Sequence, residues 1–258
     1  MITRHLSIPS SHGNYHIPAV LTLPAASRRF PAIVMCHGTG TNKDEAGQGY
    51  VLMATKLAEA GFASLRFDFI GNGESQVPYE HYSFTSAVND TLDVTAFLHQ
   101  SPLILTSQIG IMGWSQGGTI AMLAAGKTKY CAVLLWSGAL DMSGLIPAKA
   151  YQQSTYDLDL GFRPPMTIGH RWMTDVQQTN VAKNFRKSQA PVYAIAGGQD
   201  TIVPSITAKK IIEESTNSLS QFTIIPAADH LFNLLSGNDI IFKQVTSISI
   251  AWLGTIIH

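Results

Sequence analysis

Apolar residues are distributed along this chain in two patterns: short continuous runs, and longer segments with apolar positions three or four apart. The short runs predict buried strands, and the longer segments predict helices. Residues 2–8 and 14–23, on either side of a polar turn, predict an opening antiparallel hairpin. Further strands are predicted near 31–36, 62–68, 108–113, 131–137, 191–196 and 221–226.

Helical patterns lie between the later strands, near 46–60, 84–99, 115–126, 204–215 and 238–256. The last is rich in β-branched residues, but its apolar residues recur at helical spacing, so we interpret it as a helix. Strands that alternate with helices are typical of a mostly parallel sheet covered on both faces. The sequence therefore predicts a single α/β domain over residues 1–258.

The strand near 108–113 leads directly into Gly113-Trp114-Ser115-Gln116-Gly117, and a buried helical pattern follows. G-x-S-x-G between a strand and a helix is typical of a nucleophile elbow, which holds a serine on a sharp turn. The glycines fit, because a strained turn where strand and helix come close leaves no room for Cβ atoms. The motif predicts Ser115 as a nucleophile.

Such a serine needs a carboxylate and a histidine further along the chain. Asp200 and His230 each come shortly after a predicted strand. Loops that follow parallel strands share one edge of the sheet, so we expect Ser115, Asp200 and His230 to converge there. Asp229 is the alternative acid, but it is the poorer one, because neighbouring side chains in an extended segment diverge.

Backbone N–H groups that could stabilise an oxyanion are expected at two places. Gln116 follows the serine at a helix N-terminus, where N–H groups are unpaired and the dipole favours an anion. Thr39 lies in a glycine-containing loop after the strand near 31–36. His37, in the same loop, is interpreted as a structural residue that anchors the loop, since His230 already provides a base.

Four motifs carry a family resemblance: His37-Gly38-x-x-x-Asn42-Lys43, Arg66-Phe67-Asp68-Phe69-x-Gly71-x-Gly73-x-Ser75, Ser115-Gln116-Gly117-Gly118 and Ala228-Asp229-His230. With them the chain resembles the α/β-hydrolases and, within these, the small bacterial serine esterases of the cinnamoyl/feruloyl esterase type. The resemblance covers almost the whole chain except a segment at about 139–187. It implies the α/β-hydrolase fold, a triad of Ser115, Asp200 and His230, and oxyanion donors at Thr39 and Gln116.

The segment 139–187, between the sixth and seventh predicted strands, contains no clear strand–helix unit and far exceeds the usual connection of about six residues. We interpret it as a lid inserted at the active-site edge. Residues 155–162 alternate as in a short hairpin arm. An apolar substrate pocket under an aromatic-rich lid would draw on large side chains of this segment. These are Tyr151, Tyr156, Phe162, Met166 and Trp172.

For three residues in or near these motifs we expect structural rather than catalytic roles. Asp68 is expected to brace the loop 69–73 through hydrogen bonds to backbone N–H groups, and Asp90 is expected on a solvated helix face. Trp114, inside the elbow, is expected to point away from the nucleophile and to wedge against the sheet or the pocket rim.

Composition narrows the classes of function. Seventeen basic residues balance 17 acidic ones, so no overall charge favours nucleic acid or an anionic membrane. The two cysteines, Cys36 and Cys131, lack metal-ligand spacing and are interpreted as buried thiols. The remaining histidines form no metal motif, so we expect neither a metal nor another cofactor.

The N-terminal residues lack the basic and apolar regions of a secretory signal, and no apolar run reaches the roughly twenty residues that cross a bilayer. We therefore expect a cytoplasmic protein with no membrane span; the sequence leaves a homodimer open.

Together these features predict a serine carboxylesterase that hydrolyses short-chain or aryl esters, hydroxycinnamoyl esters among them, through an acyl-enzyme. A thioesterase, a peptidase and an acyltransferase stay open, because they would use the same triad. A non-catalytic binding protein is the least favoured alternative, because no triad member is missing.

Overall fold

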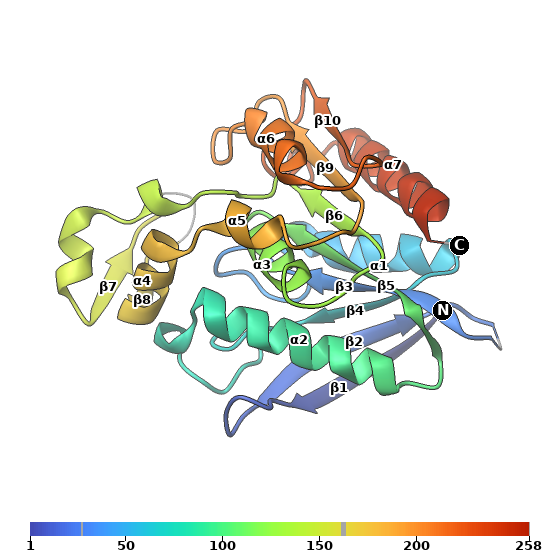
Figure 1. Cartoon of the computed structure of the whole chain (residues 1–258), viewed down its shortest axis with the longest axis horizontal. Helices are drawn as coiled ribbons and strands as arrows, with labels where there is room; N and C mark the ends of the chain where they lie inside the picture. The colour runs from blue at the N-terminus through green and yellow to red at the C-terminus, as the bar shows by residue number, and fades with distance from the viewer. Residues whose placement is uncertain (27, 161–163, 258) are drawn as a thin grey trace.

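The computed structural model describes residues 1–26, 28–160 and 164–257 (Figure 1). Its centre is an eight-stranded sheet with the strand order β1-β2-β4-β3-β5-β6-β9-β10. β2 pairs antiparallel with β1 and β4, and the other neighbours are parallel. The strands are β1 (Ile2–Pro9), β2 (His16–Leu23), β3 (Phe30–Cys36), β4 (Ala63–Phe67), β5 (Ile104–Trp114), β6 (Val133–Trp136), β9 (Val192–Gly197) and β10 (Gln221–Ile225).

The helices that follow these strands begin and end close to the predicted positions. The largest difference among the strands is β5, which begins four residues earlier than predicted. The opening hairpin, the mostly parallel sheet and the C-terminal helix are confirmed. The helices are α1 (Gly49–Glu59), preceded by the short η1 (Ala46–Gln48), α2 (Phe84–Gln100), preceded by η2 (Tyr79–His81), α3 (Gln116–Ala125), α6 (Ile206–Glu214) and α7 (Ile240–Ile256).

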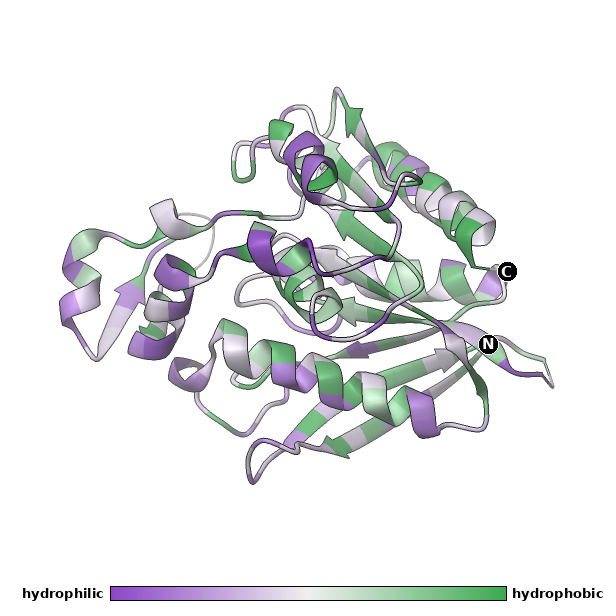
Figure 2. Ribbon diagram, in the orientation of Figure 1, coloured by the Kyte–Doolittle hydropathy of each residue, from purple (hydrophilic) through white to green (hydrophobic). Residues whose placement is uncertain are grey.

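Both faces of the sheet are buried, and β3 shows how one strand serves both. Val34 and Cys36 pack into a cluster with residues of α2 and α3, whereas Ile33 and Met35 pack with residues of α1 and α7. Alternate side chains of a strand point to opposite faces, so a strand covered on both sides needs a continuous apolar run. Figure 2 shows the hydrophobic residues concentrated on the central strands and on α3 and α7.

Between β6 and β9 the chain leaves the sheet and forms a group of short elements, of which β7, β8 and α4 lie at the left in Figure 1 and α5 lies beside α3. In this segment β7 and β8 pair antiparallel, from Thr155↔Gly169 to Leu158↔Met166. Of the hairpin arm predicted over residues 155–162, the structure describes one strand, β7, which pairs with β8. Residues 161–163 lie outside the described residues. The single domain over residues 1–258 and the lid at residues 139–187 stay predictions. Its elements are η3 (Ser143–Leu145), η4 (Ala148–Gln152), β7 (Thr155–Leu158), β8 (Met166–Gly169), α4 (His170–Gln178) and α5 (Val181–Phe185).

Among the described helices, none combines the length and the apolar character needed to cross a membrane.

Asp90 is not on a solvated face, and that prediction was wrong. Its side chain is buried, with 0% of the residue exposed. One carboxylate oxygen accepts a hydrogen bond from the Tyr15 hydroxyl (2.6 Å) and the other from the Ile70 N–H (2.8 Å). Burial raises the pKa of this carboxyl group to about 7, against the opposing effect of these hydrogen bonds. Asp90 lies four residues before the buried Val94, so helical spacing already placed it near the inner face.

We expect Asp90→Asn to change how stability depends on pH. The folded pKa of Asp90, about 7, lies above the ordinary value, so the stability contributed by the neutral carboxyl group is complete below about pH 4. It is lost as the pH rises through about 7, whereas an amide stays neutral. Between pH 5 and pH 8 the free energy of unfolding of the wild type should fall by about 2 to 3 kcal/mol relative to that of the variant.

Urea unfolding of both proteins at the two pH values measures this difference. Glu59→Gln, at an exposed carboxyl group of α1, is the control. A stability difference between wild type and Asp90→Asn that is the same at both pH values would contradict the assignment.

Candidate active site

Ser115 occupies a strained turn between β5 and α3. Its φ of 55° and ψ of −124° lie in a region that non-glycine residues rarely adopt. The Ser115 N–H donates to the Trp136 carbonyl oxygen (2.9 Å), and its own carbonyl oxygen accepts from the N–H groups of Gly118 (2.9 Å) and Ala139 (3.1 Å). The turn is therefore fixed by β6, by α3 and by the loop that follows β6.

The glycines of the motif are required by contacts between backbones. A Cβ atom on Gly117 would lie 2.0 Å from the Cys36 carbonyl oxygen, and one on Gly113 would lie 2.2 Å from the Gly117 carbonyl oxygen. The end of β3, the end of β5 and the first turn of α3 thus pack without side chains between them. The steric reason predicted for these glycines is confirmed.

Gly117→Ala should destabilise the protein by about 3 kcal/mol or more, because the new methyl group meets backbone that cannot move aside. Gly254→Ala is the matched control in α7, where a Cβ atom meets nothing within 4 Å. There the exchange should stabilise by about 0.5 to 1 kcal/mol, since alanine restricts the unfolded chain and favours helix. Denaturant unfolding of both variants checks the contrast, and similar effects of the two exchanges would refute the packing argument.

Asp200 and His230 form a direct pair across the ends of β9 and β10. His230 Nδ1 lies 2.7 Å from Asp200 Oδ2, and the exposed fractions of the two side chains are 12% and 0%. The second oxygen of Asp200 accepts hydrogen bonds from the N–H groups of Ile202 and Val203, both at 2.8 Å. Burial acts to raise the pKa of Asp200, but its hydrogen bonds and the charge of His230 outweigh burial and lower it.

Asp229, the alternative acid, is engaged elsewhere. Its Oδ1 accepts from the N–H groups of Leu231 (2.9 Å) and Asn233 (2.7 Å), so the side chain closes its own loop. Of the two carboxylates considered, Asp200 is the one bonded to His230.

A cavity of about 640 Å³ lies over the elbow, and Thr39, Ser115 and His230 all line it. Asp200 and Gln116 lie behind this lining, where Asp200 is hydrogen-bonded to His230 and Gln116 to Thr39. The structure thus gathers all of the predicted site residues around one space. Much of the remaining wall is apolar and includes Met142, Leu145, Leu160, Val203, Leu231 and Leu235.

Of the five large side chains that were predicted to form the apolar pocket, the four that the structure describes do not line this cavity. Residues 139–160 contribute aliphatic side chains, a methionine and one carboxylate, Asp141, to this wall. Trp172 is instead completely buried and packs against the Tyr82 ring, 6.3 Å between centroids. Met166 lines a different cavity, and Phe162 lies outside the described residues. No periodicity in the segment distinguished the side chains that face the cavity from those that hold the segment together.

The two predicted oxyanion residues are joined by their side chains. The Thr39 hydroxyl donates to Gln116 Oε1 (2.7 Å), and Gln116 Nε2 donates to the Tyr82 hydroxyl. The loop after β3 is thereby tied to the first residue of α3 and to the loop that precedes α2. Such ties hold two backbone segments at a constant separation.

His37 is a structural residue, as predicted. The ring is buried, its Nδ1 lies 2.9 Å from the Gly38 carbonyl oxygen, and its Nε2 accepts from the Phe69 N–H (3.2 Å). Burial lowers the pKa of His37 to about 4, so the ring is neutral at pH 7. A neutral imidazole with a proton on Nδ1 satisfies both neighbours.

Asp68 braces two loops rather than one. Its buried carboxylate accepts hydrogen bonds from the Lys43 N–H (2.7 Å), the Lys43 ammonium group (2.8 Å) and the Glu74 N–H (2.9 Å). The prediction that Asp68 binds N–H groups of the loop 69–73 was right only in part: the N–H that it binds belongs to Glu74, one residue beyond that loop, and the Ile70 N–H donates to Asp90 instead. Asp68 also connects this loop to the loop after β3.

Trp114 wedges under the site, as predicted. It is 1% exposed, and its ring packs edge-on against Trp136, 5.2 Å between centroids. Its Nε1–H donates to the His230 carbonyl oxygen (3.1 Å). This bond holds the histidine loop against the elbow.

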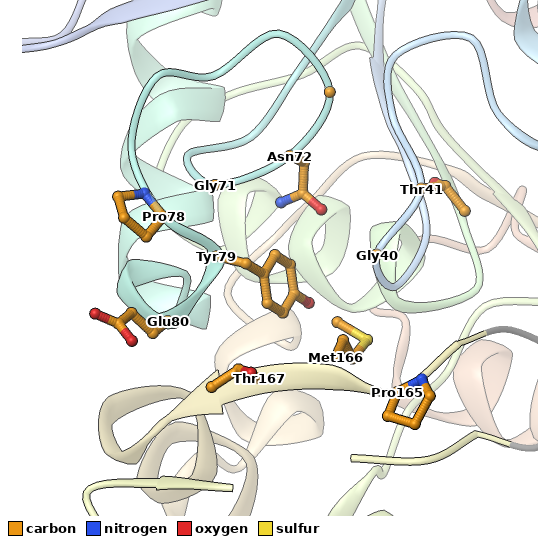
Figure 3. A pocket seen from close by; sticks show the side chains of 11 residues that line it. Gly40, Thr41, Gly71, Asn72, Pro78, Tyr79, Glu80, Pro165, Met166 and Thr167 are labelled. Carbon is orange, nitrogen blue, oxygen red and sulfur yellow. The ribbon is translucent and has the colours of Figure 1, made fainter. Parts of the chain in front are cut away.

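A second cavity, of about 450 Å³, lies beside the first (Figure 3). Gly40 and Thr41 line both cavities, so the two adjoin at the loop after β3. Figure 3 shows Asn72 of the loop after β4 and Tyr79 of η2 on one side, and Met166 and Thr167 of β8 on the other.

Both cysteines are free thiols. Cys36 is buried and Cys131 only half-buried, so the prediction of buried thiols is confirmed for Cys36 alone. Burial raises the pKa of Cys36 to about 12 and that of Cys131 to about 11, so neither forms a thiolate readily. Among the described residues, no group of three or more His, Cys, Asp or Glu side chains could hold a metal ion.

The sheet order, the strained serine after β5 and the strand-end loops that meet around it define an α/β-hydrolase. Residues 17–246 match the model of the dienelactone hydrolase family. The chain belongs to this family.

Similar proteins agree on the fold. Est1E from Butyrivibrio proteoclasticus, solved with ferulic acid bound, has a TM-score of 0.81 and 21% identity, covering 98% of this chain and 99% of that chain. The α/β-hydrolase GrgF from Penicillium sp. sh18 has a TM-score of 0.83 and 16% identity, covering 100% and 99%. At these identities the likeness concerns the fold alone.

A curated relative from Mycobacterium tuberculosis, described as “Putative phosphoribosyl transferase”, is 24% identical over 214 residues. The match covers 82% of this chain but only 38% of that protein's length.

Proposed function

We propose that this protein is a serine carboxylesterase in which Ser115, His230 and Asp200 form the catalytic triad. One observation carries the proposal: the strained Ser115 and His230, which is hydrogen-bonded to Asp200, line a single cavity. Membership of a hydrolase family and the fold of known esterases support it. The triad is recognised by such geometry rather than by sequence position.

The hydrogen bond of His230 to Asp200 decides which ring nitrogen takes part in proton transfer. Because Nδ1 of His230 is bonded to Asp200, Nε2 is the atom that takes the proton from Ser115 as its oxygen attacks the ester carbonyl carbon. Asp200 keeps the ring in this tautomer and stabilises the imidazolium. His230 then protonates the leaving alcohol, and in the second half of the reaction it activates the water that releases the acid.

The backbone N–H groups of Thr39 and Gln116 would hold the negative charge of the tetrahedral intermediate. Gln116 begins α3, so its N–H lies at the positive end of the helix dipole. Each such donor contributes about 3 to 4 kcal/mol to lowering the barrier in comparable enzymes.

The cavity indicates the substrate class. An apolar wall of aliphatic side chains over the serine suits a short acyl chain or an aryl group, and about 640 Å³ is the size of a small-molecule site. The structural relative Est1E was solved with ferulic acid, so hydroxycinnamoyl esters belong in the first substrate panel.

The purified protein should hydrolyse p-nitrophenyl acetate and p-nitrophenyl butyrate, measured as nitrophenolate release. Ser115→Ala should lower kcat by a factor on the order of 10⁴ or more, because acyl transfer to the enzyme is abolished. A fluorophosphonate probe should label the wild type and not the variant. Turnover that survives Ser115→Ala would disprove the assignment.

Asp200→Asn should lower kcat on the order of a thousandfold or more, since an amide favours the wrong tautomer of His230. Asp229→Asn is the matched control, at the neighbouring carboxylate that closes its own loop. It should keep kcat within about threefold. The reverse ranking of the two variants would make Asp229 the acid.

A thioesterase, a peptidase or an acyltransferase would use the same three residues. Esters, thioesters and amides with one common acyl group separate these activities when their kcat/KM values are compared. An added alcohol acceptor that diverts the acyl group from water would identify an acyltransferase.

A further inference from the structure

One buried carboxyl group in the cavity wall takes no part in the mechanism above. Glu45 lies between β3 and η1, is 8% exposed, and lines the same cavity as Ser115 and His230. Its φ of 63° and ψ of 173° fall in a region that residues other than glycine rarely adopt. Backbone strain of this kind persists only where surrounding contacts impose it.

Both oxygens of Glu45 accept hydrogen bonds from the backbone of its own loop. Oε1 accepts from the Gly38 N–H and Oε2 from the Ala46 N–H (3.0 Å). Burial raises the pKa of Glu45, whereas these bonds and the charge of His230 act to lower it. The side chain thus connects the two ends of the loop that carries Thr39.

Gly38 has little space between this carboxylate and the elbow. A Cβ atom built on it would lie 3.1 Å from Glu45 Oε1 and 3.5 Å from Ser115 Cβ. Glu45 therefore holds Gly38 at a point where the loop passes beside the nucleophile.

The position of Gly38 decides where the Thr39 N–H points. The Gly38 carbonyl oxygen accepts from the Thr41 hydroxyl (3.2 Å) and lies 2.9 Å from His37 Nδ1. The peptide that joins Gly38 to Thr39 is planar and trans, so the Thr39 N–H points opposite to this carbonyl group. With its N–H held by Glu45 and its carbonyl group held by these side chains, Gly38 has no freedom to turn the Thr39 amide.

We propose that Glu45 is a positioning residue for the oxyanion site: its carboxylate holds Gly38 so that the Thr39 N–H is aimed at the charge that develops over Ser115. The inference rests on the proposed function and adds a residue that the sequence motifs did not single out. Because the oxyanion forms only during the reaction, loss of this support lowers kcat and leaves KM nearly unchanged.

Glu45→Ala and Glu45→Gln test the proposal with p-nitrophenyl butyrate and with butaneboronic acid, which forms a tetrahedral anion on a reactive serine. Glu45→Ala should lower kcat between tenfold and a hundredfold, keep KM within about threefold, and weaken boronate inhibition by a similar factor to kcat. Glu45→Gln keeps an oxygen for the Gly38 N–H, so its losses should be smaller.

Asp44→Ala is the matched control. Asp44 is the preceding carboxylate in the same loop, and it pairs with Arg66 at 2.8 Å. Its loss should lower the melting temperature and leave kcat and boronate affinity unchanged. If Glu45→Ala affects kcat and boronate affinity no more than Asp44→Ala does, or raises KM alone, the proposal is overturned. Should Glu45→Ala fail to fold, Glu45→Gln decides, because wild-type kcat together with wild-type boronate affinity in that variant would also overturn it.

The proposed function fails in a different way. If the wild type neither turns over the ester nor reacts with a fluorophosphonate at Ser115, the esterase assignment falls and the role of Glu45 falls with it. An active wild type with insensitive Glu45 variants overturns this inference alone.

Discussion

The site depends on one tight contact between backbones, where the end of β3 meets the first turn of α3. Cys36 and Gly117 approach so closely that no Cβ atom fits between them, and the same junction forces Ser115 into its strained conformation. A serine held in this way presents its side chain at the rim of the sheet. Everything else around the cavity is arranged relative to that fixed point.

Two independent sets of contacts then converge on the serine. From one side, the loops after β9 and β10 bring the paired Asp200 and His230, and Trp114 binds the histidine loop to the elbow. From the other side, the loop after β3 is held by Glu45, His37 and Thr39. The two sets use different hydrogen-bonding residues, but they are linked electrostatically, because the charge of His230 acts to lower the pKa of Glu45.

The sequence predicted what periodicity and motif spacing encode. The positions of the strands along the chain, the elbow and the pairing of Asp200 with His230 follow from apolar runs and from polar residues placed just after them. The lining of the cavity was missed because no periodicity marks the side chains that face it. Asp90 was missed although its spacing from Val94 placed it near the inner face of α2, because the sequence does not show which groups would satisfy its carboxylate. A carboxylate is buried only when distant N–H and hydroxyl groups reach it, and here those belong to Ile70 and Tyr15, far away in the chain.

The segment 139–187 leaves the sheet after β6, and the chain returns to the sheet at β9. It therefore enters between the strand that carries the serine and the strand that carries the aspartate, without interrupting the hydrogen bonds of either. Beyond Ala139, whose N–H donates to the Ser115 carbonyl oxygen, a segment of another length would leave the hydrogen bonds of these strands intact. The wall of the cavity that this segment provides is therefore built on a connection between strands and not on the strands themselves.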